Sequence, residues 1–313
     1  MPAYIHDIII ANPDTAIPQQ TIREIMKERL AKDRKTEATS LFLEVGKKLL
    51  LQNPEIDKSK ITHVITVSCT GFFAPGPDFE VVKGLGLSAS TQRFHIGFMG
   101  CYAAFPALKM AAAFCEADPN ACVLVICAEL CTIHIQSEND IDNLLASSVF
   151  ADGAAGVLVS SQKPTKKGFR MNAFASSLAY EGEQDMAWTI GNTGFQMTLS
   201  SYVPDIITAN LASVIDPLFS TLSISADVVD LWAVHPGGRA IVDKVQKSME
   251  LADLQVEASR NVLSKFGNMS SATILFVLEE ILKSNLETDA TILPMAFGPG
   301  LTIESGLFIM INS

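Results

Sequence analysis

Apolar residues along the chain form two recurring patterns, short continuous runs and longer stretches with helical spacing. The runs at residues 62–68, 122–129 and 156–161 are rich in Val and Ile and predict buried strands. Residues 21–30 and the stretch from Met99 to Glu116 predict helices. The second half repeats this style, with a strand at 228–235 and helices at 239–251 and 271–283. Apolar strands that alternate with helices indicate an α/β fold whose sheets are covered on both faces.

The length of 313 residues, with 48% hydrophobic and 18% charged positions, suits a large core and two fused α/β halves. We expect these halves at residues 1–162 and 163–313, because the short stretch 163–167 is the best candidate for a junction. The net charge of -11 argues against nucleic acid or an anionic membrane as a general partner. It also means that any site for a CoA thioester needs a local cluster of Lys or Arg.

The features of export and membrane insertion are missing from the sequence. The N-terminal residues lack the basic start, apolar run and cleavage site of a signal peptide, and no apolar run reaches the ~20 residues of a membrane span. The six cysteines include no CxxC pair, and none follows Cys131. We therefore expect a cytoplasmic protein with reduced thiols and without a metal site.

Cys101 lies at the predicted start of a helix that is rich in Ala, Leu and Met. A thiol in this position feels the positive end of the helix dipole, which predicts a lowered pKa. Gly100 before it permits the sharp approach that a nucleophile needs. A single cysteine is nevertheless more often an inert buried residue, so Cys101 needs support from other residues.

Two further residues supply that support. His235 follows a strand and precedes Pro236-Gly237-Gly238, and Asn268 lies between a Gly and a helix start. Each alone fits a structural role, a loop His bonded to a carbonyl or an Asn at an N-cap or turn. Together they suit acyl transfer, in which a thiolate takes an acyl group from a thioester, His pairs with the thiolate, and His and Asn donate to the oxyanion. Papain-like proteases share this order of residues, but they are usually secreted and disulfide-bonded.

Several strings in the chain resemble the type III polyketide synthases of the chalcone synthase superfamily. They are GCYAAFPALKMA around Cys101, VFADGAAGVLV (149–159), WAVHPGGRAI (232–241), FGNMSSATILFVLEE (266–280) and AFGPGLTIE (296–304). Residues 188–204 are similar to bacterial members, and the resemblance to ketoacyl-ACP synthases III, which share the triad, is weaker at these strings. The resemblance implies a thiolase-like fold with two similar halves in a five-layer α-β-α-β-α sandwich. It also implies an active site between the halves, a homodimer, and no metal or organic cofactor.

The resemblance assigns roles to residues of this chain. Cys101, His235 and Asn268 correspond to the catalytic triad, and Phe150 and Met197 to the two gate positions between the CoA tunnel and the cavity. The other implied cavity residues are Cys69, Thr70, Ala74, Cys131, His134, Trp188, Ser270, Phe297 and Pro299. Glu129, together with Cys69 and Ser270, is implied in activating a water for ring closure.

Substrate class follows from the sizes of these cavity residues. Ala74 is small and in this resembles the mycobacterial long-chain alkylpyrone synthases, in which small residues at such positions open a tunnel for a fatty acyl tail. Each buried CH₂ of that tail would contribute up to ~0.8 kcal/mol. Trp188 and His134 are large, so a narrow tunnel is favoured over a broad pocket. The same substitutions could instead only repack the wall. The resemblance thus implies loading of a medium- or long-chain acyl group from acyl-CoA and extension with malonyl-CoA by decarboxylative Claisen condensation. An alkylpyrone is favoured over an alkylresorcinol, because the thiol of Cys69 is a poor hydrogen-bonding group.

The sequence departs from the family between Thr15 and about Ser59, where it is shorter by a segment. In the family that segment carries basic residues that grip the CoA phosphates. The basic cluster left here is either a solvated helix face or a remnant of that site; it consists of Lys27, Arg29, Lys32, Arg34 and Lys35. We assign no CoA-phosphate ligands. A weak acyl-CoA site, a carrier-bound donor, and a catalytically silent subunit that pairs with an active partner remain alternatives, and the intact triad argues against the silent subunit.

Overall fold

The computed structural model describes residues 2–12, 34–71, 73–134, 148–191, 194–284, 286 and 289–311. In the first half the elements are β1 (Ala3–Ala11), α2 (Arg34–Gln52), β2 (His63–Ser68), α3 (Pro77–Leu85), β3 (Gln92–Gly97), α4 (Ala104–Ala117), β4 (Cys122–Leu130), the 3-10 helix η2 (Cys131–His134) and β5 (Asp152–Ser160). In the second they are β6 (Gly168–Leu178), β7 (Met186–Gly191), β8 (Gly194–Leu199), α6 (Val203–Leu222), β9 (Leu231–Val234), α7 (Arg239–Ser248), α8 (Glu257–Phe266), η6 (Ser270–Ala272), α9 (Thr273–Lys283), β10 (Thr291–Gly298) and β11 (Thr302–Ile311).

The two halves repeat one strand arrangement. Nine strands are hydrogen-bonded in the order β3-β2-β4-β5-β1-β6-β11-β10-β9. In the first half β2 is parallel to β4, and β5 is antiparallel to both β4 and β1. In the second half β9 is parallel to β10, and β11 is antiparallel to both β10 and β6. β1 pairs with β6 only through Ala3, Tyr4 and Ile5, so the halves form two sheets that meet at one corner.

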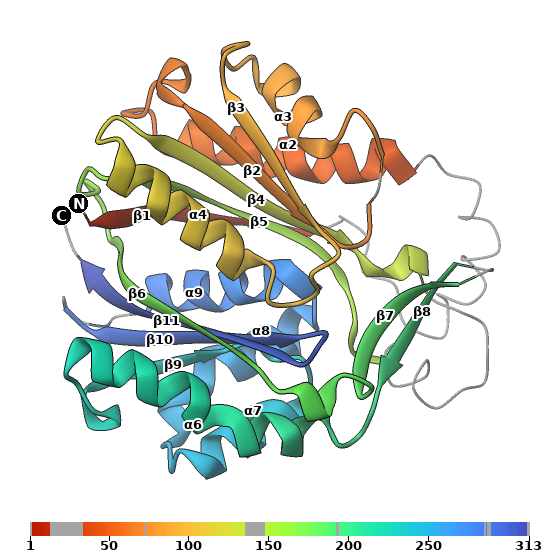
Figure 1. Ribbon diagram of the computed structural model, residues 1–313. Helices are drawn as coiled ribbons and strands as arrows, with labels where there is room; N and C mark the ends of the chain where they lie inside the picture. Colours follow the sequence, from red (N-terminus) through yellow and green to blue (C-terminus); the bar gives the residue numbers. More distant parts are fainter. Residues whose placement is uncertain are drawn as a thin grey trace.

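Helices cover both sheets and also separate them, which produces five layers (Figure 1). α2 and α3 lie on the outer face of the first sheet, α4 and α9 lie between the sheets, and α6 and α7 cover the outer face of the second. Three buried apolar clusters fill these interfaces, and the central one joins α4 and α9 to both sheets. The thiolase-like α/β fold predicted from the sequence is confirmed.

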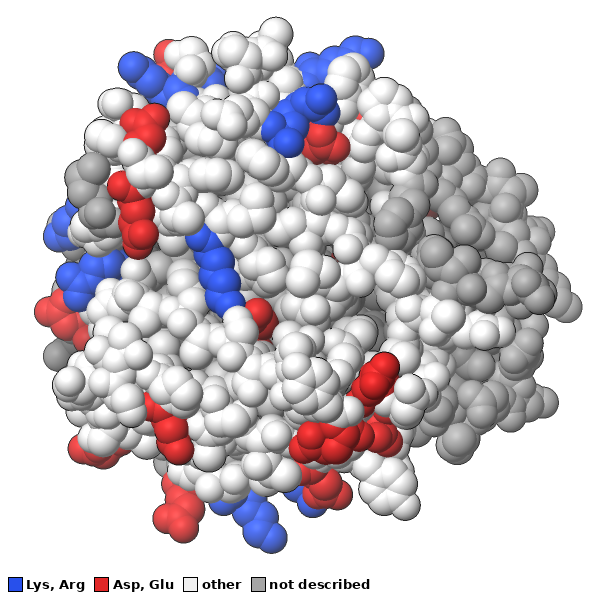
Figure 2. Space-filling view, in the orientation of Figure 1, with Lys and Arg blue, Asp and Glu red and all other residues white. Residues whose placement is uncertain are grey.

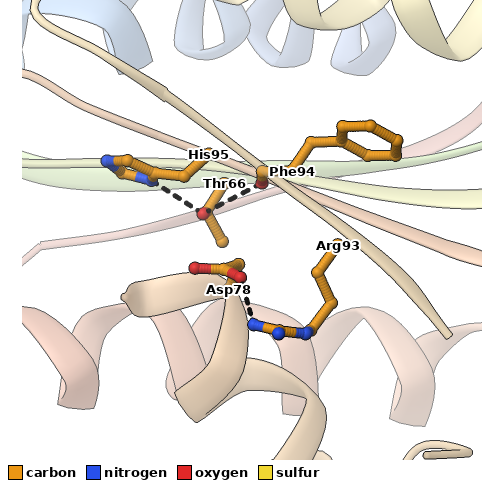
Figure 3. Close-up of polar contacts among 5 residues, drawn as sticks. All are labelled: Thr66, Asp78, Arg93, Phe94 and His95. Carbon is orange, nitrogen blue, oxygen red and sulfur yellow. Dashed lines mark hydrogen bonds and ion pairs between the residues drawn. The ribbon is translucent and has the colours of Figure 1, made fainter. Parts of the chain in front are cut away.

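β3 is the edge strand of the first sheet and leads directly to the turn that carries Cys101. Its side chains are fixed by polar contacts with β2 and α3 (Figure 3). Arg93 forms an ion pair with Asp78 on α3 at 2.5 Å. The Thr66 hydroxyl on β2 lies 2.9 Å from His95 Nδ1 and donates to the Phe94 carbonyl at 3.4 Å. These contacts hold β3 although only one of its edges is paired.

Most of the predicted elements are observed, with two differences. The strands at 62–68, 122–129 and 156–161 appear as β2, β4 and β5, and the strand at 228–235 shortens to β9. The helix expected from Met99 begins only at Ala104, because residues 101–103 form a turn closed by the Ala103 N–H to the Gly100 carbonyl. The helix predicted at 21–30 lies outside the described residues. Among the helices that the structure describes, none is long and apolar enough to cross a membrane.

Candidate active site

The turn that carries Cys101 is shaped by two glycines and a proline. Gly100 has φ 81°, a left-handed conformation that favours glycine. A Cβ at Gly100 would lie 2.4 Å from Cδ of Pro299, and a Cβ at Gly298 would lie 2.5 Å from the Tyr102 ring. The 297–300 loop of the second half therefore packs directly against the nucleophile turn of the first. The sequence prediction that Pro299 lies at the site agrees with this contact.

The Cys101 thiol contacts the loop between α8 and α9. Its Sγ lies 3.6 Å from Ser270 Oγ and 4.0 Å from Asn268 Oδ1. Asn268 Oδ1 also accepts hydrogen bonds from the Ser270 backbone N–H at 2.9 Å and from the Thr273 hydroxyl at 3.3 Å. These donors fix the orientation of the amide, so that its Nδ2 group points toward the Gly237 carbonyl at 3.4 Å. That contact is long, and the amide N–H remains able to serve a ligand.

The gate residue Phe150 is tied to this loop through the backbone. Phe150 and Asn268 form an isolated parallel bridge, in which the Ala151 N–H donates to the Asn268 carbonyl at 2.8 Å. The Asn268 N–H donates to the Val149 carbonyl at 2.9 Å. Phe150 thus lies beside the triad amide, as the resemblance implies.

His235 follows β9 and is 1% exposed. Its backbone N–H donates to the Met295 carbonyl at 2.8 Å, but neither ring nitrogen has a hydrogen-bond partner among the described residues. A Cβ at Gly237 would lie 3.7 Å from His235 Nε2, so the ring lies against the Gly237 turn whose carbonyl Asn268 contacts. A buried imidazole without partners is costly, and such a group at a site is suited to bind a ligand.

Burial controls the charge of the triad. Burial, together with the Glu129 carboxylate, raises the pKa of the Cys101 thiol to about 11, and burial lowers the pKa of His235 to about 3. The lowered Cys101 pKa expected from a helix start is therefore wrong for the thiol by itself. Cys101 precedes α4 by three residues of turn, and the loss of solvation outweighs the helix dipole. Taken one at a time, both groups are therefore neutral near pH 7, and the expected thiolate–imidazolium pair requires that the two charges form together.

Glu129, at the end of β4, is fully buried and accepts four donors. The backbone N–H of Cys69 lies 3.0 Å from Oε2, that of Thr70 3.2 Å, and the Thr70 hydroxyl 2.8 Å. The Ser271 hydroxyl donates to Oε1 at 2.5 Å. Burial raises the pKa of Glu129 to about 7 in spite of these bonds. The expected partner Ser270 bonds to Cys101 instead, and Ser271 takes its place on Glu129.

Aromatic side chains join the β7–β8 hairpin to the nucleophile turn. Trp188 stacks on Phe98 with ring centroids 5.4 Å apart and meets His134 edge-on at 5.5 Å. His134 Nε2 lies 2.8 Å from the Thr70 carbonyl oxygen, and Trp188 pairs with Met197 across the hairpin. Phe98 has φ 60°, unusual for a bulky residue, and the Trp188 stack fixes it in that conformation. Trp188, His134 and Met197 thus lie together beside the turn that carries Cys101.

Two predicted cavity residues lie elsewhere, and a third stays near the site. Ala74 is exposed in the loop before α3, so it does not line a tunnel within this chain. Phe297 is 1% exposed and packs in the apolar cluster under α6 and α7, because alternation along β10 turns Ala296 toward the middle layer and Phe297 away from it. Cys131 begins η2 directly after β4, where burial raises its thiol pKa.

Ser271, Thr273 and Phe98 are site residues that the sequence analysis did not assign. Ser271 and Thr273 belong to the hydroxyl run after Asn268, and a buried glutamate such as Glu129 requires donors of this kind. Nothing in the sequence signals the left-handed φ of Phe98. In the part of the chain that the structure describes, no group of three His, Cys, Asp or Glu is placed to hold a metal.

Family models match nearly the whole chain. Residues 24–163 match the N-terminal domain of chalcone and stilbene synthases, and residues 171–312 match the C-terminal domain of the same family. The chain belongs to the chalcone and stilbene synthase family. As a type III polyketide synthase of this family it is an acyltransferase of the condensing type.

Solved structures agree with this assignment. PKS-I from the brown alga Ectocarpus siliculosus is 26% identical with a TM-score of 0.89, and the alignment covers 99% of this chain and 98% of that one. The C-terminal type III polyketide synthase domain of Steely1, a type I/III hybrid from Dictyostelium, is 23% identical with a TM-score of 0.84 over 99% and 100% of the chains. At that identity the second match shows the fold alone.

Proposed function

We propose that this type III polyketide synthase loads an acyl group from acyl-CoA onto Cys101 and extends it with malonyl-CoA. The proposal is supported by the contact of the Cys101 thiol with the oriented Asn268 amide, and by the buried His235 ring, which lies against the Gly237 turn that Asn268 also contacts. Burial penalises a lone thiolate or imidazolium, so the Cys101 proton passes to His235 as the two charges form a pair. The thiolate then attacks the thioester carbonyl, and the CoA thiolate leaves.

Extension uses the same donors. When malonyl-CoA loses CO₂, the bonding electrons remain on the malonyl-derived fragment as an enolate, and N–H groups of His235 and Asn268 stabilise its oxygen. The enolate carbon attacks the acyl group on Cys101 and expels the thiolate. The new chain now lies on CoA, and Cys101 is free for reloading.

We propose a medium- or long-chain fatty acyl starter. Support comes from the wall of Trp188, His134 and Met197 rather than from Ala74, which is exposed. Met197 replaces a ring with a flexible side chain and makes the gate beside Phe150 adaptable. The basic cluster at Lys27, Arg29 and Lys32 lies outside the described residues, and no residue is assigned to the CoA phosphates.

We propose an alkylpyrone as the product class. A carboxylate offers about four acceptor sites, and those of Glu129 are occupied by the donors of Cys69, Thr70 and Ser271. Cys69 Sγ, in turn, accepts the Gly100 N–H at 3.0 Å. Neither Glu129 nor Cys69 is therefore left to activate a water. This favours ring closure in which an enol oxygen attacks the thioester, because routes to an alkylresorcinol need such a water.

We further propose a homodimer, with the cytoplasm as its location and a junction between its halves at residues 163–167. Figure 2 shows a face that carries few charges over α4 and the strand β6 in front of it. β3, at the edge of the first sheet, offers unpaired backbone groups for a second copy. Sedimentation analysis should give twice the chain mass of 33.7 kDa, and a monomer at micromolar concentration would contradict the dimer.

The test is mass spectrometry of the intact protein and of its products. Incubation with acyl-CoA of increasing chain length should add the acyl mass to Cys101 in the wild type and not in Cys101→Ala. With malonyl-CoA present, lactone products should form best with lauroyl or longer starters. Folded protein that gains no adduct from any starter would support the silent-subunit alternative, and loading only from an acyl carrier protein would support one resembling ketoacyl-ACP synthase III.

A further inference from the structure

Glu129 is a buried carboxylate that the condensation itself does not use. It is 0% exposed, and no ion pair in the described part of the chain includes it. Keeping such a group ionised in a core costs free energy unless donors compensate for it. Four donors offset part of this cost, and they come from two segments far apart in the sequence, the residues after β2 and the residues before α9.

We propose that Glu129 is a positioning residue for Cys101, because its carboxylate ties the segment that supports Gly100 to the segment that contacts the Cys101 thiol. The proposal rests on the proposed function in one respect, that Cys101 is the nucleophile. It assigns Glu129 no contact with substrate and no transfer of a proton to it.

The first arm runs through Cys69. The Cys69 N–H donates to Glu129 Oε2 at 3.0 Å, and Cys69 Sγ accepts the N–H of Gly100, the residue before the nucleophile, at 3.0 Å. Thr70 strengthens this arm, since its hydroxyl accepts the Leu130 N–H at 2.8 Å and therefore directs its own proton to Glu129. The position of the turn that carries Cys101 thus depends on where Glu129 holds Cys69.

The second arm runs through Ser271. Its hydroxyl donates to Glu129 Oε1, and its neighbour Ser270 places a hydroxyl 3.6 Å from Cys101 Sγ. Ser270 has φ 47°, so the start of η6 is held in a conformation that needs support from its surroundings. The Ser270 N–H also orients the Asn268 amide. One carboxylate therefore fixes both the thiol and its donor loop.

Only an ionised carboxylate can accept all four donors. If Glu129 is protonated, one oxygen becomes a donor and faces another donor. The Glu129 charge raises the pKa of four nearby thiols, those of Cys69, Cys101, Cys127 and Cys131. His134 bonds to the Thr70 carbonyl, and burial keeps His235 uncharged. No cation among these groups offsets the charge of the Glu129 carboxylate. Because the pKa of Glu129 is near 7, its hydrogen bonds to the four donors are sensitive to pH in the physiological range.

The experiment compares acyl loading of Cys101 in wild type, Glu129→Gln and Ser271→Ala, by rapid-quench mass spectrometry with lauroyl-CoA between pH 6 and 9. Matched controls are Glu304→Gln and Ser176→Ala, because Ser176 donates to the buried Glu304 at 2.9 Å as Ser271 does to Glu129. We expect Glu129→Gln and Ser271→Ala to slow loading about 10- to 100-fold at pH 8, the factor for one or two lost hydrogen bonds to a charged group. The controls should stay within about threefold of wild type.

The pH dependence separates positioning from general damage. The ratio of the wild-type rate to the Glu129→Gln rate should be large above pH 8 and shrink as the pH falls to 6, with a midpoint near 7. Equal rates in wild type and Glu129→Gln, or a ratio that does not change with pH, would overturn the proposal.

A second readout works without any acyl-CoA. Alkylation of Cys101 by iodoacetamide should have a lower pH midpoint in Glu129→Gln than in wild type, because the carboxylate raises the pKa of the thiol. A wild type that never loads an acyl group refutes the proposed function. An unchanged alkylation midpoint in Glu129→Gln refutes the placement of Glu129 beside Cys101, whichever way the loading assay turns out.

Discussion

At the scale of single residues, the site is governed by the cost of burying charge. His235 and Cys101 are both neutral in the resting state because burial opposes imidazolium and thiolate separately. A thiolate can form only where a cation forms beside it. The chemistry therefore depends on proton transfer within the pair and not on an acidic thiol.

This dependence predicts the effect of removing the imidazole. In His235→Gln the Cys101 thiol should titrate with a midpoint near about 11, as burial alone dictates. In wild type His235 takes up the proton, and the midpoint should be lower. Iodoacetamide alkylation of Cys101 followed by peptide mass spectrometry measures both curves. His6→Gln is a matched control, because His6 is also buried with a lowered pKa but lies on β1. Superimposable curves for wild type and His235→Gln would contradict the pairing.

The ionised Glu129 carboxylate supports activity in this proposal but lowers the free energy of unfolding. Its pKa rises from 4.5 unfolded to about 7 folded, so the folded state binds the proton more tightly. This tighter proton binding adds about 3 kcal/mol to the free energy of unfolding. The contribution is complete below pH 4.5 and is lost as the pH rises to 7. Glu129→Gln should therefore unfold in urea at pH 8 with a free energy at least equal to that of wild type, although it loads more slowly. A large loss of stability in this variant would show that the four donors outweigh the buried charge.

At the scale of elements, the most apolar strands were predictable, whereas the other strands and the turns that aim side chains were not. The apolar runs identified β2, β4, β5 and β9, because continuous Val and Ile can satisfy only a strand buried on both faces. The predicted start of α4 was wrong because the turn before it is shaped by the contact of Gly100 with Pro299, and these two residues are distant in the sequence. Phe297 was assigned to the cavity from its neighbours in a string, and the period of two along β10 places it on the other face.

The close packing of the 297–300 loop on the Cys101 turn can be tested with one methyl group. In Gly298→Ala the new Cβ would lie 2.5 Å from the Tyr102 ring, so the turn must move. We expect stability to fall by about 1–3 kcal/mol, the usual cost of overpacking, and acyl loading to fall more than tenfold. Urea denaturation and loading kinetics measure the two effects. Gly71→Ala is the control, since its Cβ would meet nothing closer than 3.6 Å.

At the scale of the molecule, the duplicated architecture explains where the site forms. Cys69 follows β2 and His235 follows β9, the equivalent strands of the two halves, while Glu129 and Gly298 lie at the ends of β4 and β10. Carboxyl ends of parallel strands carry sites in α/β proteins, and here two such edges meet. The family strings made this arrangement predictable as a whole. The family strings could not predict that Ala74 is exposed, because its exposure depends on the path of its loop.

An ion pair across the halves contributes to their docking. Lys109 on α4 contacts Glu304 on β11 and Ser176 on β6, and Glu304 is 6% exposed. Lys109→Met keeps most of the apolar stem but leaves Glu304 buried without its cation, and we expect a loss of about 2–4 kcal/mol in the free energy of unfolding. The double variant Lys109→Met with Glu304→Gln should recover much of this loss. Equal stabilities of wild type and Lys109→Met would mean that the pair contributes nothing.

The pairing of β1 has a consequence for how the protein is made. β1 precedes the other described strands in sequence but lies in the middle of the strand order, and Ala11 pairs with Ala154 while Tyr4 pairs with both Ser160 and Arg170. On the ribosome this strand emerges long before its partners, and its row of Ile residues has nothing to pair with until the whole first half has been synthesised. Closing so long a loop is slow, which makes β1 a natural binding segment for chaperones during translation.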